Sequence, residues 1–289
     1  MKRLLILVLL FILVGCSSSN IATTVVCPSG GPLLSLIPLI DDDNYVLDVV
    51  DGGEVLQAEF AKGEADIIVA PVNLGTKLSL KTGNYKISHI VTFSNLYFVT
   101  KDSNYTKIAA FGKESVPGKV VQYLDDYIPS DRIEWYESVN EALASLLSGQ
   151  CDAAILAYPA VSKIEDTKEY NIENILNMYK EKSGYSNYPQ AALFVSNSYY
   201  EDNEDTFNRT IETLMRHNVD YIVNDKQFNE FVNNHDMSQF GIKDKSLVLN
   251  RYDKLAINIK PIHECKDDVN QLLSLFGFEM DDSIILGMK

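Results

Sequence analysis

GEADIIVAP, residues 63–71, sets a pattern that the chain repeats as GQCDAAILAYP at residues 149–159. In each copy a glycine ends an amphipathic segment, an aspartate precedes a short apolar run, and proline closes the run. A short apolar run between two helical segments is typical of a buried parallel strand. The repetition predicts two α/β lobes with one plan. Because open α/β sheets bind ligands at the carboxyl ends of their strands, we expect Pro71 and Tyr158-Pro159 to face each other across a cleft.

The segments around the two copies predict matching elements. Two runs that read as β-strands precede each copy, at residues 22–27 and 45–50 before the first and at 107–111 and 132–136 before the second. In each lobe the first of these strands leads into a loop with glycine and proline, and proline suits the first turn of a helix. Ser138 and Glu141 form a capping box, which predicts a helix before the second copy.

The two lobes need connections. The run 85–100 reads as a strand interrupted at Ser94-Asn95, which suits a crossing between lobes, and 188–195 suits the return. We also expect a strand at 175–178 and, from residue 199 onward, helices that pack against the first lobe. The domain prediction is therefore a first lobe of residues 22–95 and 192–289 and a second lobe of residues 96–191.

Composition excludes several classes of function. The chain has 289 residues with a formal net charge of -15, and nucleic-acid binding requires a basic face instead. No cysteine pair has metal-ligand spacing, no HExxH motif occurs and no Gly-x-Ser-x-Gly elbow is present. We therefore expect no metal, no cofactor and no enzymatic activity. Cys27 and Cys151 read as small buried hydrophobes, and a disulfide among these two and Cys265 stays open.

The N-terminal sequence predicts that the mature protein lies outside the cytoplasm. Residues 1–15 have a charged head and an apolar run too short to span a membrane, which is typical of a signal peptide. The sequence Leu13-Val14-Gly15-Cys16 resembles the lipobox of bacterial lipoproteins, which implies lipid on Cys16 and a tether at 16–21. Such acyl chains anchor a protein to the membrane. The alternative is an ordinary cleaved signal with an incidental cysteine.

Together with the loop Ser29-Gly30-Gly31-Pro32 and the run Tyr188-Pro189-Gln190, these features resemble the solute-binding lipoproteins of bacterial ABC importers. The similarity is greatest to the nitrate/sulfonate/taurine and thiamine-precursor branch, which has the type II periplasmic-binding fold. This resemblance implies two α/β lobes, two crossover segments and an interlobe cleft that closes over a small organic solute. It also implies delivery of that solute to a membrane permease.

The resemblance also implies ligand positions. With Tyr188 added as a ring that could stack on the ligand, the candidate ligand-binding residues are Ser29, Gly30, Gly31, Pro32, Val72, Asn73, Leu74, Phe93, Asn95, Lys113, Glu114, Ser115, Tyr158, Tyr188 and Gln190. Only Lys113 is a candidate cation in the cleft, so a neutral, zwitterionic or heteroaromatic solute is favoured. It would be held by amide side chains, backbone N–H groups and aromatic rings.

Other interpretations stay open for some of these residues. Tyr158 and Tyr188 fit plain core packing equally well, and Lys113 also fits a solvated loop position. Two further functions compete with solute binding. One is an enzyme on the same fold, which a lipid anchor disfavours, and the other is an interaction lipoprotein whose cleft is vestigial.

Overall fold

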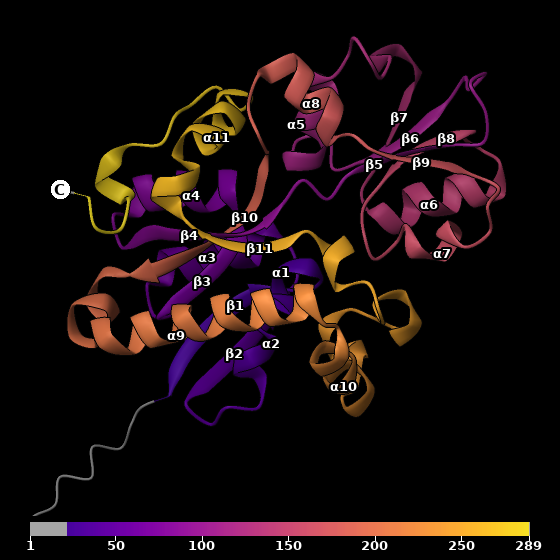
Figure 1. Ribbon diagram of the computed structural model, residues 1–289. Helices are drawn as coiled ribbons and strands as arrows, with labels where there is room; N and C mark the ends of the chain where they lie inside the picture. Colours follow the sequence, from indigo (N-terminus) through magenta and orange to yellow (C-terminus); the bar gives the residue numbers. More distant parts are fainter. Residues whose placement is uncertain (1–21, 289) are drawn as a thin grey trace, which may run out of the picture.

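The structure is a computed structural model that describes residues 22–288, so the predicted signal peptide and Cys16 lie outside the described residues (Figure 1). Within this range the chain forms two β-sheets, each packed against helices. The prediction of a two-lobed α/β fold is confirmed. No helix between residues 22 and 288 combines the length and apolar composition needed to cross a membrane.

The first lobe is built on a six-stranded sheet with the order β11-β4-β10-β3-β1-β2. Strand β1 pairs in parallel with β2 and β3, while β10 runs antiparallel to both β3 and β4. The strands are β1 (Thr23–Pro28), β2 (Tyr45–Val50), β3 (Ile67–Pro71), β4 (Tyr85–Phe93), β10 (Pro189–Ser196) and β11 (Ile257–Pro261).

The second lobe has a five-stranded sheet with the order β7-β6-β8-β5-β9. Strand β6 pairs in parallel with β7 and β8, and β5 runs antiparallel to β8 and β9. The strands are β5 (Tyr97–Thr100), β6 (Ile108–Phe111), β7 (Ile133–Tyr136), β8 (Ala153–Leu156) and β9 (Asn171–Asn174). Both sheets therefore share one core arrangement, in which three parallel strands in the order second, first, third are followed by an antiparallel strand.

The repeated stretch supplies the third parallel strand of each lobe. Strand β3 comes from GEADIIVAP and β8 from GQCDAAILAYP, and the side chains from Ile67 to Ala70 and throughout β8 are buried. The preceding helices, α3 (Gly53–Lys62) and α6 (Val139–Ser148), end at Gly63 and Gly149 with φ of 70° and 74°. Glycine adopts this left-handed conformation without strain, so it ends each helix and turns the chain into the strand.

The aspartate of each stretch fastens the third strand to the first. The Asp66 Oδ2 atom accepts hydrogen bonds from the Thr24 backbone N–H (2.8 Å) and hydroxyl (2.9 Å). In the second lobe, Asp152 Oδ1 accepts from the backbone N–H groups of Thr106 (2.9 Å) and Lys107 (2.9 Å). Burial opposes ionisation of Asp152, but these hydrogen bonds outweigh it and lower the pKa of that carboxyl. Equivalent residues thus perform equivalent tasks in the two lobes.

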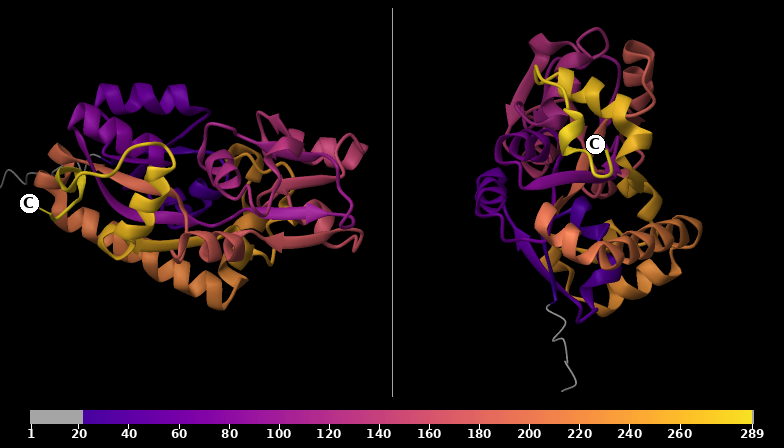
Figure 2. Two further views of the ribbon diagram at one scale, coloured as in Figure 1. Left: turned by 90° about the horizontal axis from the view of Figure 1, so that it is seen from above. Right: turned by 90° about the vertical axis from the view of Figure 1, so that its left-hand side faces the viewer.

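Helices cover both faces of the first-lobe sheet. Alternate residues of β1 and β3 point to opposite faces, so Val25 and Ile67 pack with one set of helices and Val26 and Ile68 with the other. The first set contains α1 (Gly31–Leu34), α2 (Ile37–Ile40) and α9 (Asn197–Val223), and the second contains α3, α4 (Val72–Thr82) and α11 (Ile262–Ser274). Figures 1 and 2 show the long helix α9, in orange, running along the first lobe.

One predicted strand is a helix in the structure. Residues 175–178, predicted as a strand, lie mostly in α8 (Leu176–Ser183), and the edge strand β9 comes just before it. Burial of Ile175 and Tyr179, four residues apart, follows the helical period instead. The other short elements are α5 (Val116–Tyr123), α7 (Ser162–Glu165), α10 (Lys226–Asn234), η1 (Ser130–Arg132), η2 (Met237–Phe240), η3 (Lys245–Leu247), η4 (Tyr252–Leu255) and η5 (Asp282–Ile284).

Gly75 provides a test of how α4 packs on the sheet. A Cβ atom at this position would overlap ring atoms of Phe194, which lies fully buried on β10. Alanine gains about 1 kcal/mol over glycine inside a helix, but overlap with a buried ring outweighs this gain. We expect Gly75→Ala to lower the free energy of unfolding in urea by about 1–3 kcal/mol.

The matched control is Gly53→Ala. A Cβ atom there would meet only Leu74 Cδ2 at 3.7 Å, an ordinary contact. This variant should stay within about 0.5 kcal/mol of the unmodified protein. Equal stability of the two variants would show that Gly75 of α4 does not pack closely against the Phe194 ring.

Candidate functional site

A cavity of about 620 Å³ opens between the two lobes. The first lobe contributes Ser29 and Gly30, directly after β1, and the second contributes α6 and residues that follow β8. A third wall comes from residues 241–247. Metabolite sites typically have volumes of about 300–1,000 Å³, so this cavity has a suitable size. Its lining residues are Ser29, Gly30, Val139, Asn140, Leu143, Ala144, Leu147, Pro159, Ala160, Lys163, Gly241, Ile242, Lys243, Asp244 and Leu247.

One face of α6 makes the apolar side of this cavity. Val139, Leu143, Ala144 and Leu147 are spaced at helical intervals and all line it. Leu143 is also part of the core, whereas Leu147 is 56% exposed. An exposed leucine on a cavity wall offers apolar surface that a ligand can cover.

Charged side chains complete the lining. Lys163 and Lys243 are exposed, and neither forms an ion pair within residues 22–288. Hydrogen bonds from Ser246 and, to a smaller extent, the charge of Lys163 lower the pKa of Asp244, which is therefore ionised at neutral pH. Lys113 is the only cation expected in the cleft from the sequence, and Lys163 and Lys243 are two further lysines that line this cavity. No sequence motif marks Lys163 or Lys243, because they reach the cavity only through the packing of the segments to which they belong.

The wall from residues 241–247 lies directly against the loop after β1. The Gly30 N–H donates to the Phe240 carbonyl (3.2 Å), and Gly30 has a φ of 92°. A Cβ atom at Gly241, where φ is 77°, would come within 3.2 Å of Ser29 Cβ. Glycine suits position 30 because of its positive φ, and at position 241 it also allows the close approach to Ser29.

The segment 237–255, which contains η2, η3 and η4 and is called the bridging segment below, also contacts the second lobe. Its Arg251 pairs with Glu165 (Nε–Oε2 3.4 Å) and Asp166 (Nη2–Oδ2 3.1 Å) beyond β8. The Ser162 hydroxyl donates to the Leu247 carbonyl (2.8 Å). From the sequence, the whole part of the chain after residue 199 is expected to pack against the first lobe. The helices α9 and α11 do so, but the bridging segment reaches across to the second lobe.

Asn95 occupies the crossing from β4 to β5 and connects three parts of the molecule. Its Nδ2 donates to the carbonyls of Tyr158 (3.1 Å) and Leu255 (3.4 Å), and its Oδ1 accepts from the Tyr158 N–H (3.0 Å). The Asn95 backbone N–H donates to Gln190 Oε1 (3.1 Å) on the return crossing. Its side-chain amide therefore joins three segments: the crossing from β4 to β5, which is called the hinge below, the residues just after β8, and the bridging segment.

Of the predicted ligand-binding residues, Ser29 and Gly30 line the cavity together. Pro159 lines it as well, next to Tyr158, whereas Pro71 does not. Tyr158 is buried against Tyr97, with ring centroids 5.1 Å apart, and burial together with the Glu165 carboxylate raises its pKa. The four-residue helix α1 begins at Gly31 and Pro32, next to the lining residues.

The other predicted residues lie elsewhere around the hinge and strand ends. Phe93, Val72 and Tyr188 are buried, and Tyr188 packs on Tyr179 with ring centroids 5.0 Å apart. Asn73 and Leu74, which follow Val72 in the first turn of α4, are partly buried. Lys113, Glu114 and Ser115 form an exposed loop before α5, in which Glu114 pairs with Lys119 (2.7 Å). A role in ligand binding stays a prediction for all of them.

The three described cysteines, Cys27, Cys151 and Cys265, are buried and free, which answers the open disulfide question. Cys27 is enclosed by the core, and burial raises its pKa. Cys151 also lies near polar groups, with its Sγ 3.6 Å from Glu134 Oε2. Within residues 22–288, no group of three or more His, Cys, Asp or Glu side chains is arranged to hold a metal ion.

Comparison with protein-family models finds no match, and comparison with curated proteins finds no similar sequence. Solved structures do match. An ABC transporter protein from Parabacteroides distasonis superposes with a TM-score of 0.76 at 18% identity, over 93% of this chain and 100% of that one. The periplasmic aliphatic sulphonate binding protein SsuA from Escherichia coli gives 0.68 at 12% identity, over 93% of each chain.

A third match is the ligand binding component of an ABC-type import system from Staphylococcus aureus, solved with zinc bound. It has a TM-score of 0.64 at 12% identity, over 91% of this chain and 96% of that one. The chain therefore has the fold of the periplasmic binding proteins of ABC importers, which confirms the fold that the resemblance implied.

The hydrogen bonds of Asn95 predict the effect of Asn95→Ala. This change leaves the buried N–H and C=O groups of Tyr158 without their side-chain partner, and each unsatisfied buried group costs about 1–3 kcal/mol. We expect the free energy of unfolding, measured in urea, to fall by about 2–4 kcal/mol. Asn140→Ala, at an exposed cavity position, should change it by less than about 0.5 kcal/mol. A small effect at Asn95 would remove its assigned structural role.

A second prediction concerns His235, just before the bridging segment. Its Nε2 lies 3.0 Å from Asp41 Oδ1, and its Nδ1 lies 2.8 Å from the Phe231 carbonyl. Partial burial opposes protonation, but these two hydrogen bonds outweigh it and raise the pKa of His235. The pair therefore stabilises the fold fully below the unfolded-state pKa of about 6.5, and the contribution is lost as pH rises through the higher folded-state pKa.

His235→Gln should consequently cost more stability at about pH 5.5 than at about pH 8. Because Asp41 is exposed, the difference between the two pH values should stay below about 1 kcal/mol. Urea unfolding of both proteins at each pH measures it. The same cost at both pH values would contradict the proposed ionisation.

Proposed function

We propose that the chain is an extracytoplasmic binding protein that takes up a small organic solute between its lobes and delivers it to the permease of an ABC importer. The observation that carries this proposal is the cavity between two lobes of one repeated plan, bounded by the residues that follow β1 and β8. The fold shared with binding proteins of ABC importers supports it. A lipid on Cys16 would hold the protein at the membrane beside its permease.

The lining favours a solute with an apolar body and charged or polar ends. Leu143, Ala144 and Leu147 offer apolar surface, while Lys163, Lys243 and Asp244 bring charges of both signs to the same cavity. A zwitterionic solute matches this combination, because each of its charges finds an opposite partner. This narrows the neutral, zwitterionic or heteroaromatic class expected from the sequence.

The same lining favours binding over catalysis. The only hydroxyl nucleophile among the lining residues is Ser29, whose Oγ donates to Asp51 Oδ1 (3.2 Å). None of the lining residues is a histidine, so the set lacks the serine–histidine pair on which most hydroxyl nucleophiles depend, and the partner of the Ser29 hydroxyl is the Asp51 carboxylate instead.

Filling the cavity tests this function. The solute is first identified from the mass of the small molecule that co-purifies, or from a thermal-shift screen of pyrimidines, sulfonates, amino acids and nucleobases. Ala144 is exposed on the cavity wall, so Ala144→Trp should occupy the space without disturbing the core. We expect the affinity for the solute, measured by calorimetry, to fall by at least about tenfold.

The matched control is Ala61→Trp, at an exposed position of α3 that does not line the cavity. It should bind the solute as the unmodified protein does. If folded protein bound no compound of any screened class, or if both variants bound equally well, solute binding in this cavity would be refuted.

A further inference from the structure

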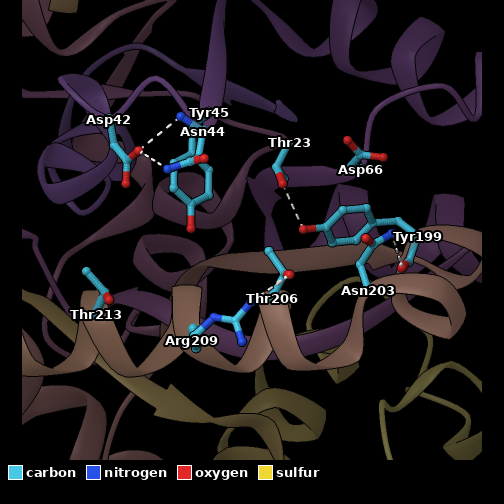
Figure 3. A pocket seen from close by; sticks show the side chains of 10 residues that line it. All are labelled: Thr23, Asp42, Asn44, Tyr45, Asp66, Tyr199, Asn203, Thr206, Arg209 and Thr213. Carbon is cyan, nitrogen blue, oxygen red and sulfur yellow. Dashed lines mark hydrogen bonds between the residues drawn. The ribbon is translucent and has the colours of Figure 1, made fainter. Parts of the chain in front are cut away.

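A second cavity, of about 650 Å³, lies at the opposite end of the first-lobe sheet (Figure 3). Thr23, the first residue of β1, lines this cavity, whereas Ser29, just beyond the last residue of β1, lines the interlobe cavity. A strand rises about 3.3 Å per residue, so about 20 Å of β1 separates the two. The second cavity is therefore independent of the interlobe site.

Every residue that lines this cavity has a polar or charged group in its side chain. Five hydroxyl-bearing side chains, two amides, two carboxylates and one guanidinium line it. Figure 3 shows Thr206 and Arg209 on α9, facing Asp42 and Asn44 across the cavity. Two tyrosines among the hydroxyl-bearing side chains supply its only aromatic surface.

A kink in α9 borders the cavity. Asn203 departs from helical geometry, with φ of −135° and ψ of 29°, and its Nδ2 donates to the Tyr199 carbonyl (3.1 Å). Both residues line the cavity, and the Tyr199 hydroxyl is 2.8 Å from Thr23 Oγ1. Asn203 and Tyr199 therefore bring the irregular turn of α9 to the cavity wall.

The carboxylates of the cavity are already engaged by neighbouring groups. Asp66 Oδ2 accepts from both the N–H and the hydroxyl of Thr24, and Asp42 Oδ1 accepts from the Asn44 N–H (2.9 Å). Within residues 22–288, Asp66 Oδ1 and Asp42 Oδ2 accept no hydrogen bond. These two oxygens remain as hydrogen-bond acceptors, although their charges are partly satisfied by local donors.

Arg209 supplies most of the free donors. Its Nη2 donates to Thr206 Oγ1 (3.0 Å), and within residues 22–288 it forms no ion pair. A guanidinium has five N–H donors in a fixed plane, so most of its donors are available to a ligand.

This mixture discriminates between ligand classes. Two carboxylates against one guanidinium disfavour an anion, and the guanidinium with the engaged carboxylates disfavours a cation. Within the described chain, no group of three or more His, Cys, Asp or Glu side chains is arranged to hold a metal ion. A hydroxyl both donates and accepts, so a ligand rich in hydroxyls can satisfy the free acceptors and the free donors together. We propose that this cavity is a second binding site, which takes a neutral sugar.

The test uses the purified full chain and ligand-observed NMR with glucose, mannose, N-acetylglucosamine, maltose and sorbitol as probes. Inorganic phosphate and putrescine represent the anionic and cationic classes. We expect at least one of the neutral probes to bind, and Arg209→Gln and Thr206→Val each to weaken that binding at least about tenfold. Arg209 is exposed, so its variant should fold, and a thermal unfolding scan verifies this.

Arg216→Gln is the matched control, since Arg216 is exposed on the same helix and does not line the cavity. It should leave sugar binding unchanged, and so should Ala144→Trp in the interlobe cavity. Binding of phosphate or putrescine alone, no binding of any probe, or sugar binding that survives Arg209→Gln would overturn the proposal. Sugar binding lost only in Ala144→Trp would assign the sugar to the interlobe cavity instead.

Discussion

Each lobe depends on a carboxylate that binds the start of a neighbouring strand. Asp66 receives the N–H and hydroxyl of Thr24, and Asp152 receives the N–H groups of Thr106 and Lys107. These bonds set the register between the first and third parallel strands of each sheet. Because a strand that slips by one residue turns every side chain to the other face, the buried faces of both sheets depend on this register. The strand register also fixes where β1 and β8 end, and the loops that bound the interlobe cavity begin at those ends.

The cleft also depends on contacts between segments that are distant in sequence. Asn95 ties the hinge to the end of β8 and to the bridging segment, and Arg251 extends that segment onto the second lobe. The interlobe cavity is therefore enclosed on three sides by segments that are distant in sequence and come from both lobes. In contrast, the residues that line the polar cavity all lie in the first lobe, at the amino end of β1.

The sequence predicted the elements wherever two independent signals agreed. The apolar runs of β3 and β8 were each bounded by glycine and proline, and Ser138 with Glu141 marked the start of α6, where the Ser138 hydroxyl accepts from the Glu141 N–H (3.3 Å). At residues 175–178 only a short apolar run was available. Such a run fits a strand and a buried helical turn equally well, and the prediction of a strand was wrong.

The sequence by itself determined the repeated α/β plan, because helix ends, apolar runs and strand-starting aspartates are local patterns that each residue shares with its near neighbours. Only the tertiary structure decided which side chains meet at a cavity. Lys163, Lys243 and Leu147 reach the interlobe cavity, and Arg209 reaches the polar one, through packing between elements far apart in the chain. No local pattern encodes such meetings, since they follow from the positions that whole helices and loops adopt when the cores close.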